Sequence, residues 1–442
     1  MGIVSGVASA LQRLLGSKAE ETAEASGLIK RRRKFSGSTL LSTFVLGFLR
    51  KPKATSEDLA RTAAELGVGV TPQAVRKRYG PDLVESLRNL FDAGVTEAIA
   101  GEARSIPLLR KFTAVDIGDS STIGLPDELA EQFPGCGGKS ESGKAALKLQ
   151  VELDQIDGRL KVVLEAGRQS DAKSALMKTL PAGGSLTIRD LGYFSLEWFN
   201  SLIAVAAFFI SRLQPKTMVF DPEGTPLDLL KTLQEYTGDK PFERDVLLGK
   251  DERVPCRLIA LRAPPEAVAR RRQKAYEKAR KDGRTPSAEH LAWLAFTVFI
   301  TNCGSEKLSW KEVVVLYRLR WQIELLFKLW KSHNLLAHVD ERDTADMRMA
   351  KFYARLTGAL VQHWILLTSA WTSARHSLRK AAVVIQEHLL LILAAITDSE
   401  QLRLTLERLT RLVDRPSRIG KRKQRPGTHQ LLLNPELLEY VF

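Results

Sequence analysis

The sequence of 442 residues is poor in cysteine, with only Cys136, Cys256 and Cys303, which lie far apart and form no Cys-x-x-Cys pair. So small and odd a number excludes a disulfide framework and argues against a zinc site. It favours a reducing compartment. We therefore expect a cytoplasmic protein.

Long apolar runs are also missing. The stretch from Leu202 to Ile210 is among the longest, and it falls well short of the ~20 residues that span a bilayer. The first cation is Arg13, so the early basic region of a secretion signal is absent. We expect neither a membrane segment nor a secretion signal.

Acidic residues are fewer than basic residues in this sequence. The chain has 66 Lys and Arg residues against 51 Asp and Glu residues, a net charge of +15. The natural partner of such a chain is a polyanion. The basic residues are spread over several segments, which favours nucleic acid over a membrane surface.

The stretch from Tyr317 to Lys331 contains neither Gly nor Pro, and its apolar residues recur at helical spacing, which predicts one helix. Beside the apolar stripe, Tyr317, Arg320, Glu324 and Lys331 share an arc of about 60°. A carboxylate can hold a divalent cation, while the two cations and the phenol can bind phosphate oxygens. The alternative is a surface helix with an intrahelical ion pair between Arg320 and Glu324. The predicted apolar stripe consists of Leu316, Leu319, Ile323, Leu326, Phe327 and Trp330.

The spacing of these four polar residues resembles the Y-R-E-K signature of DDE transposases of bacterial insertion sequences, the IS-four family. The resemblance covers about residues 105 to 370. It implies an RNase H-like fold, two Mg²⁺ ions with Mn²⁺ as a possible substitute, and double-stranded DNA as substrate, both transposon terminal repeats and target. It also implies a homodimer on paired DNA ends and a place at the bacterial nucleoid.

Two aspartates upstream extend the resemblance: Asp119 in Asp-Ser-Ser-Thr and Asp190 in Asp-Leu-Gly-Tyr. The segment from Lys111 to Pro126 predicts a strand that ends near Asp116 and Asp119. The resemblance makes Asp119, Asp190 and Glu324 the metal ligands, with Asp116 as the alternative first ligand. It makes Tyr317, Arg320 and Lys331 contacts to DNA phosphates. Three carboxylates also suit phosphodiester hydrolysis with two metal ions.

The remaining pattern predicts an α/β fold: an RNase H-like mixed sheet with flanking helices, interrupted by a β-rich insertion. The predicted core spans 105–215 and 293–370, and the insertion spans 216–292 with a basic helix. The expected strands are 145–153, 160–164, 185–189, 245–248, 256–261 and 293–300, and the expected helices include 196–210, 266–281 and 383–396.

Residues 1–104 predict a helical DNA-binding region, and 371–442 a helical C-terminal region with a basic tail. Thr55 and the pair Thr71-Pro72 predict two helix starts, the outline of a helix-turn-helix at about 55–80. In that motif the residues that read or contact DNA would be Gln73, Arg76, Lys77 and Arg78.

The family resemblance implies cut-and-paste transposition through nicking, a DNA hairpin, its reopening and joining to target DNA. Trp293 or Phe296 would stack on an extruded base, or alternatively serve as strand core. Two other functions stay open. One is a repressor that binds transposon ends with an inactive core, and the other is a structure-specific nuclease without strand transfer.

Overall fold

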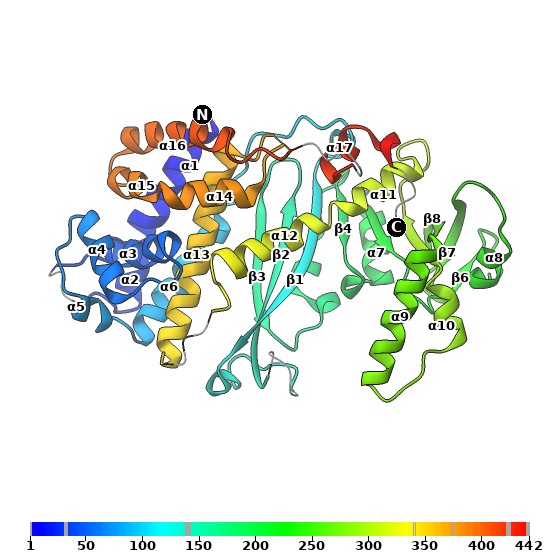
Figure 1. Ribbon diagram of the computed structural model, residues 1–442, viewed down its shortest axis with the longest axis horizontal. Helices are drawn as coiled ribbons and strands as arrows, with labels where there is room; N and C mark the ends of the chain where they lie inside the picture. Colours follow the sequence, from blue (N-terminus) through cyan, green and yellow to red (C-terminus); the bar gives the residue numbers. More distant parts are fainter. Residues whose placement is uncertain are drawn as a thin grey trace. The chain divides into compact units, whose positions relative to one another are not determined.

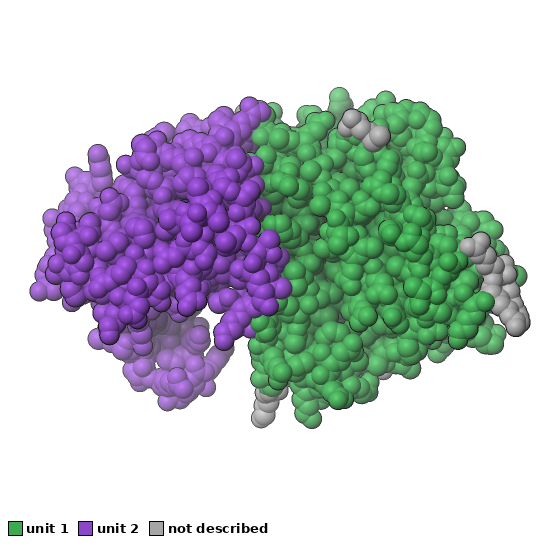
Figure 2. Space-filling view, turned by 180° about the vertical axis from the view of Figure 1, so that it is seen from behind, with its two compact units in different colours: residues 1–105, 120–169, 323–420 green, residues 106–119, 170–322, 421–442 purple. Residues whose placement is uncertain are grey.

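The computed structural model describes residues 2–30, 34–137, 143–338, 340, 342–373, 375–420 and 426–438. The basic runs at 31–33 and 421–425 therefore lie outside the described residues. The chain forms two compact units (Figure 2). Unit 1 comprises Met1–Ser105, Ser120–Gln169 and Ile323–Gly420, and unit 2 comprises Ile106–Asp119, Ser170–Gln322 and Lys421–Phe442.

The strands form a mixed sheet of nine in the order β3-β2-β1-β4-β5-β9-β8-β7-β6. The pairs β1–β4 and β4–β5 are parallel, while β2–β3, β5–β9, β9–β8, β8–β7 and β7–β6 are antiparallel. This confirms the predicted α/β class and matches the expectation for an RNase H-like core. The strands are β1 Val115–Leu125, β2 Ala145–Asp154, β3 Leu160–Ala166, β4 Leu186–Arg189, β5 Phe208–Arg212, β6 Val219–Phe220, β7 Phe242–Leu248, β8 Val254–Arg262 and β9 Phe296–Thr301.

Unit 1 is built around one long helix, α13 (Ala345–Ser369), which packs against α3, α6 and α16 (Figure 1). Its apolar residues Leu356, Leu360, Trp364 and Leu367 are all buried. The segment 383–396 is two helices, because the chain turns at His388 between α14 and α15. The other helices assigned here to unit 1 are α1 Ile3–Gln12, α2 Ala19–Ala25, α3 Gly37–Arg50, α4 Ser56–Glu65, α5 Pro72–Arg76, α6 Pro81–Thr96, α14 Leu378–Glu387, α15 Leu389–Ala395 and α16 Ser399–Asp414.

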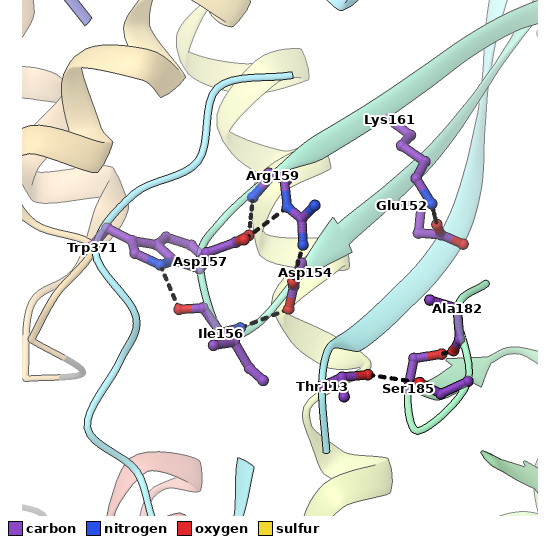
Figure 3. A network of polar contacts seen from close by, with 11 residues as sticks. Thr113, Glu152, Asp154, Ile156, Asp157, Arg159, Lys161, Ala182, Ser185 and Trp371 are labelled. Atoms are coloured by element: carbon purple, nitrogen blue, oxygen red, sulfur yellow. Dashed lines mark hydrogen bonds and ion pairs between the residues drawn. The ribbon is translucent and has the colours of Figure 1, made fainter. Parts of the chain in front are cut away.

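The β2–β3 hairpin is anchored to the end of α13 (Figure 3). The Trp371 indole N–H donates to the Ile156 carbonyl at 3.2 Å, and the Arg104 guanidinium lies 3.6 Å from the centre of the Trp371 ring. His363 Nε2 lies 2.7 Å from the Gly158 carbonyl, so that nitrogen must carry the proton. Gly158 in the hairpin turn has a φ of 78°, a left-handed conformation that glycine adopts without steric cost.

Unit 2 contains the strands from β4 to β9, and its core includes a stacked pair of rings, Phe199 and Phe209, at 4.3 Å. The strands of the predicted insertion continue the same sheet, since β8 pairs along β9. The helices of unit 2 are α7 Leu196–Ala204, α8 Leu229–Glu235, α9 Pro265–Lys281, α10 Ala288–Trp293, α11 Trp310–Arg318 and α17 Thr428–Leu433.

The predicted helix 196–210 is wrong in its second half. Ser195 caps α7, but the helix ends at Ala204. Ala206 has a φ of 54°, and the Ala207 N–H bonds to the Leu202 carbonyl at 2.9 Å. This is a Schellman-type ending, usually marked by glycine, with alanine in its place. The following residues form β5 instead.

Two strand boundaries also differ from the prediction. The strand predicted from Trp293 begins at Phe296, because Ser287 caps α10 and the helix carries Trp293. In addition, β1 continues to Leu125, so Asp116 and Asp119 lie within the strand and not at its end.

No described helix combines the length and apolar character needed to cross a membrane.

We predict that His363 makes unit 1 sensitive to acid. Burial lowers the pKa of His363 from 6.5 to about 4. Between pH 6.5 and pH 4 the unfolded chain binds a proton at His363 that the folded chain does not. The contribution of the neutral His363 to the free energy of unfolding is therefore fully present above pH 6.5 and is lost as the pH falls towards 4. The loss reaches about 3 kcal/mol. It is measured by urea unfolding at several pH values.

The matched control is His363→Gln, which keeps an N–H donor but cannot titrate. Its free energy of unfolding should fall less between pH 6.5 and pH 4 than that of the wild type. Equal pH dependence in the two proteins would show that His363 does not cause the effect.

Candidate active site

The two upstream aspartates are placed by the parallel pairing of β1 with β4. In the register, Val115 lies opposite Leu186 and Gly118 lies opposite Arg189. The next residues along the two strands are Asp119 and Asp190. Side chains alternate between the faces of a sheet, and residues at equivalent positions share a face. Asp119 and Asp190 therefore project from the same face of the sheet.

Asp116 lies three positions before Asp119 on β1 and hence projects from the opposite face. It is in register with Thr187 and only 7% exposed. The geometry groups Asp119, rather than Asp116, with Asp190.

Arg320 binds both aspartates. Its Nη1 lies 3.0 Å from Asp119 Oδ2, and its Nε lies 3.9 Å from Asp190 Oδ1. The Arg320 and Asp119 side chains are each 19% exposed, so water screens this contact only partly. Two carboxylates thus converge on one cationic group in unit 2.

Tyr317 adds a neutral donor beside this cluster. Its ring packs edge-on against Phe299 at 5.1 Å, and Arg320 hydrogen-bonds to its phenol oxygen. Burial raises the pKa of Tyr317 above its usual value of 10, so the phenol keeps its proton at neutral pH.

The single helix predicted from Tyr317 to Lys331 is wrong. The chain forms α11, a tight turn at Leu319 and Arg320, α12 (Trp321–Lys328) and a π-helical turn over Leu329–His333. Around the interruption, amides bond to carbonyls three residues earlier, for example Gln322 to Leu319 at 2.7 Å. The predicted apolar stripe is nonetheless buried throughout, as seen for Leu316, Leu319, Ile323, Leu326, Phe327 and Trp330.

Glu324 and Lys331 belong to unit 1. Glu324 lies on α12 and is partly exposed. Lys331 lies in the π-helical turn, where its Nζ donates to the Thr122 carbonyl at 2.8 Å. Thr122 follows Asp119 by three residues along β1. The structure thus groups Asp119, Asp190, Arg320 and Tyr317 within unit 2, and ties Lys331 to β1 within unit 1.

The donor set suits a hard divalent cation. Asp119 and Asp190 offer carboxylate oxygens, which Mg²⁺ and Mn²⁺ prefer, and both already bind the Arg320 guanidinium. Across the described ranges, no three His, Cys, Asp or Glu side chains gather into a metal cluster. Asp119 and Asp190 alone therefore supply two of the oxygen donors that a divalent cation would need.

Residues 112–351 match the family described as "Transposase DDE domain". The match covers more than half of the chain. The chain belongs to this family.

Relatives of this DDE-domain chain include named transposases of insertion sequence elements. The IS231B transposase of Bacillus thuringiensis subsp. berliner is 27% identical over 449 residues, which cover 94% of this chain and 92% of the relative. The IS231F transposase of Bacillus thuringiensis subsp. israelensis is 27% identical over 447 residues, with 93% and 91% covered. The IS1151 transposase of Clostridium perfringens is 26% identical over 321 residues, with 67% and 66% covered.

Sequence reasoning missed one exposed aromatic residue of the DDE domain, Trp321. It follows Arg320 directly and is 54% exposed. The two aromatic residues predicted to stack on a base are less accessible. Phe296 is buried, and Trp293 packs partly buried against the core of unit 2. The signal for Trp321 was its place on the helical wheel outside the apolar stripe.

The predicted helix-turn-helix precedes the DDE domain. Its caps are confirmed, since Thr55 and Thr71 accept hydrogen bonds from the starts of α4 and α5. The second helix, α5, has only five residues, and Val75 anchors it in the core. The four predicted DNA contacts are largely accessible: Gln73, Arg76 and Lys77 are exposed, and Arg78 lies 5.7 Å from the Phe35 ring.

We predict a measurable coupling between Arg320 and Asp119 in this DDE domain. A double-mutant cycle with Arg320→Ala and Asp119→Asn should give about 1 kcal/mol, because the pair is short and partly buried. The same cycle with Asp190→Asn should give less, since that contact is longer. Urea unfolding measures both. A larger coupling to Asp190 would contradict the geometry.

Proposed function

We propose that this chain is a DNA transposase that moves an insertion sequence by cut-and-paste. The main support is the convergence of Asp119 and Asp190 on one cationic group within a transposase DDE domain. Glu324 would be the third carboxylate. The substrates would be transposon terminal repeats and target DNA, both double-stranded.

In the proposed mechanism Asp119, Asp190 and Glu324 hold two Mg²⁺ ions, or Mn²⁺ in their place. Bound ions of this kind activate a water molecule or a 3′ hydroxyl as nucleophile and stabilise the leaving oxygen. The three side chains act as oxygen donors. Their spacing along the chain, on β1, after β4 and on α12, lets separate elements position each one.

Arg320, Lys331 and Tyr317 would contact phosphates of the DNA strand. Arg320 is held in place by Asp119, and its planar guanidinium can bind two phosphate oxygens. Tyr317 keeps its proton and can donate one further hydrogen bond. Lys331 is held by the Thr122 carbonyl and can still donate through its remaining ammonium hydrogens.

A hairpin intermediate is part of the proposal. Forming it requires a sharply bent DNA end and an unstacked base. Trp321 directly follows Arg320 in the sequence, and its side chain is 54% exposed. Stacking of a base on such a ring is worth about 1–3 kcal/mol. We propose Trp321 for this role in place of Trp293 and Phe296.

The proposed DNA contacts of the N-terminal region are Gln73, Arg76, Lys77 and Arg78 on and after α5. We further propose a homodimer that holds two DNA ends. The alternatives are a repressor with an inactive core and a nuclease without strand transfer. A joining assay separates them, because only the transposase yields end–target products, while the repressor binds without cutting.

We predict that Glu324→Gln removes cleavage of a labelled transposon-end duplex in Mg²⁺ but keeps duplex binding. A neutral amide is a poor Mg²⁺ ligand, so the cleavage rate should fall by at least about 10²-fold. Gel analysis of cleavage and fluorescence anisotropy of binding measure the two properties.

The matched controls are Asp116→Asn and Asp119→Asn. Their carboxylates lie on opposite faces of β1, so only the second variant should lose cleavage to the same extent. If Asp116→Asn were inactive and Asp119→Asn active, the first ligand would be reassigned. If Glu324→Gln cut normally, the proposed site would be wrong.

A further inference from the structure

The helix α9 carries an unusual density of positive charge. Its sequence, PEAVARRRQKAYEKARK, contains seven cations and two carboxylates, and Ala267 is its one buried residue. A charge run of this kind is often merely a solvated surface. The orientation of α9 and the ion pairs of its cations distinguish a solvated surface from a binding surface.

Two arginines fix the orientation of α9 on unit 2. Arg271 donates to the Leu294 and Phe296 carbonyls at 3.1 and 3.3 Å and to the Thr297 hydroxyl at 3.0 Å. Arg272 donates to the Leu291 carbonyl at 3.2 Å. These bonds hold one face of α9 against α10 and β9. The other cations of α9 therefore lie on faces that do not contact α10 or β9.

Four of these cations, the basic stripe, occupy one side of the helix. At 100° per residue they fall within an arc of about 80°, and they span about 16 Å along the axis. All four are exposed, and the C-terminal half of α9 extends clear of the strands of unit 2 (Figure 1). The basic stripe consists of Arg270, Lys274, Lys278 and Lys281.

The basic stripe is only partly offset by the carboxylates of its own helix, Glu266 and Glu277, which stand four residues before Arg270 and Lys281. Within the described part of the chain, no ion pair links any of its members to a carboxylate. Arg270 and Lys274, and again Lys274 and Lys278, are like charges four residues apart, which destabilises a helix. The helix dipole favours only the cations of the last turn. A polyanion outside the chain would remove this repulsion.

We propose that the basic stripe of α9 binds the phosphate backbone of double-stranded DNA without reading its sequence. Aligned cations on one helical face suit a regular row of phosphates. A membrane surface fits less well, because amphipathic membrane helices expose large apolar residues opposite their cations, and α9 has none beyond Tyr276. The biological role rests on the proposed function, in which DNA is the substrate.

The test uses full-length protein and a fluorescein-labelled duplex that lacks the terminal repeat, with affinity measured by anisotropy at several salt concentrations. The test variant is R270Q/K274Q/K278Q/K281Q. Each phosphate contact adds about 0.9 to the slope of log K against log salt concentration, so the slope should fall by up to about 3.6. Circular dichroism and thermal unfolding establish that the variant is folded.

Two control variants show whether the effect depends on the position of the cations on α9 or on the net charge of the protein. In R270K/K274R/K278R/K281R the charges stay, so the slope should stay. In R379Q/R408Q/R411Q/R415Q four exposed cations of unit 1 are lost, and the slope should change little. An unchanged slope in the test variant, or an equal fall in the unit 1 control, would overturn the proposal.

The measurement also separates this proposal from the proposed function. Binding of the duplex needs neither metal nor cleavage. A protein that cuts transposon ends but shows no slope change in the test variant would contradict only the role of α9. A protein that shows the slope change but never cuts would contradict only the transposase mechanism. Binding to anionic vesicles but not to the duplex would likewise overturn the proposal.

Discussion

The parallel register of β1 and β4 is the constraint on which the candidate site depends. With Gly118 opposite Arg189, the residues that follow are both aspartates and share one face of the sheet. A slip of one residue would move one carboxylate to the other face. Arg189, one position before Asp190, illustrates the alternation, since its side chain is buried beside the Trp198 ring.

Arg320 places a positive charge beside the two aspartates that this register brings to one face of the sheet. Two carboxylates on one face would repel each other, and the guanidinium between them lowers that cost. The tight turn at Leu319 and Arg320, between α11 and α12, accompanies this placement. In the proposed reaction the same arginine would share its attraction between the aspartates and the incoming phosphates. In the structure, a side chain of the protein itself thus supplies the positive charge beside the two aspartates.

The sequence predicted those features that local signals determine. These features include the strands at 145–153 and 160–164, the helix start at Thr55 and the buried face of the segment before Lys331. They depend on nearby residues, and all are confirmed. The end of α7 was missed because alanine replaces the usual glycine at Ala206. The family resemblance already favoured Asp119 over Asp116, but which of them shares a face with Asp190 follows from the register with β4, which is a long-range property. The turn at Arg320 does not disturb the periodicity of the apolar residues, so that periodicity could not predict the turn.

The central claim is that Asp190 is a metal ligand in a DNA-cutting site. The most direct measurement is the cleavage rate of a transposon-end duplex by Asp190→Cys in Mg²⁺ and in Mn²⁺. A thiolate binds Mg²⁺ poorly and Mn²⁺ better, so the variant should be inactive in Mg²⁺ and regain cleavage in Mn²⁺. Cleavage in Mg²⁺ at the rate of the wild-type protein would contradict the claim.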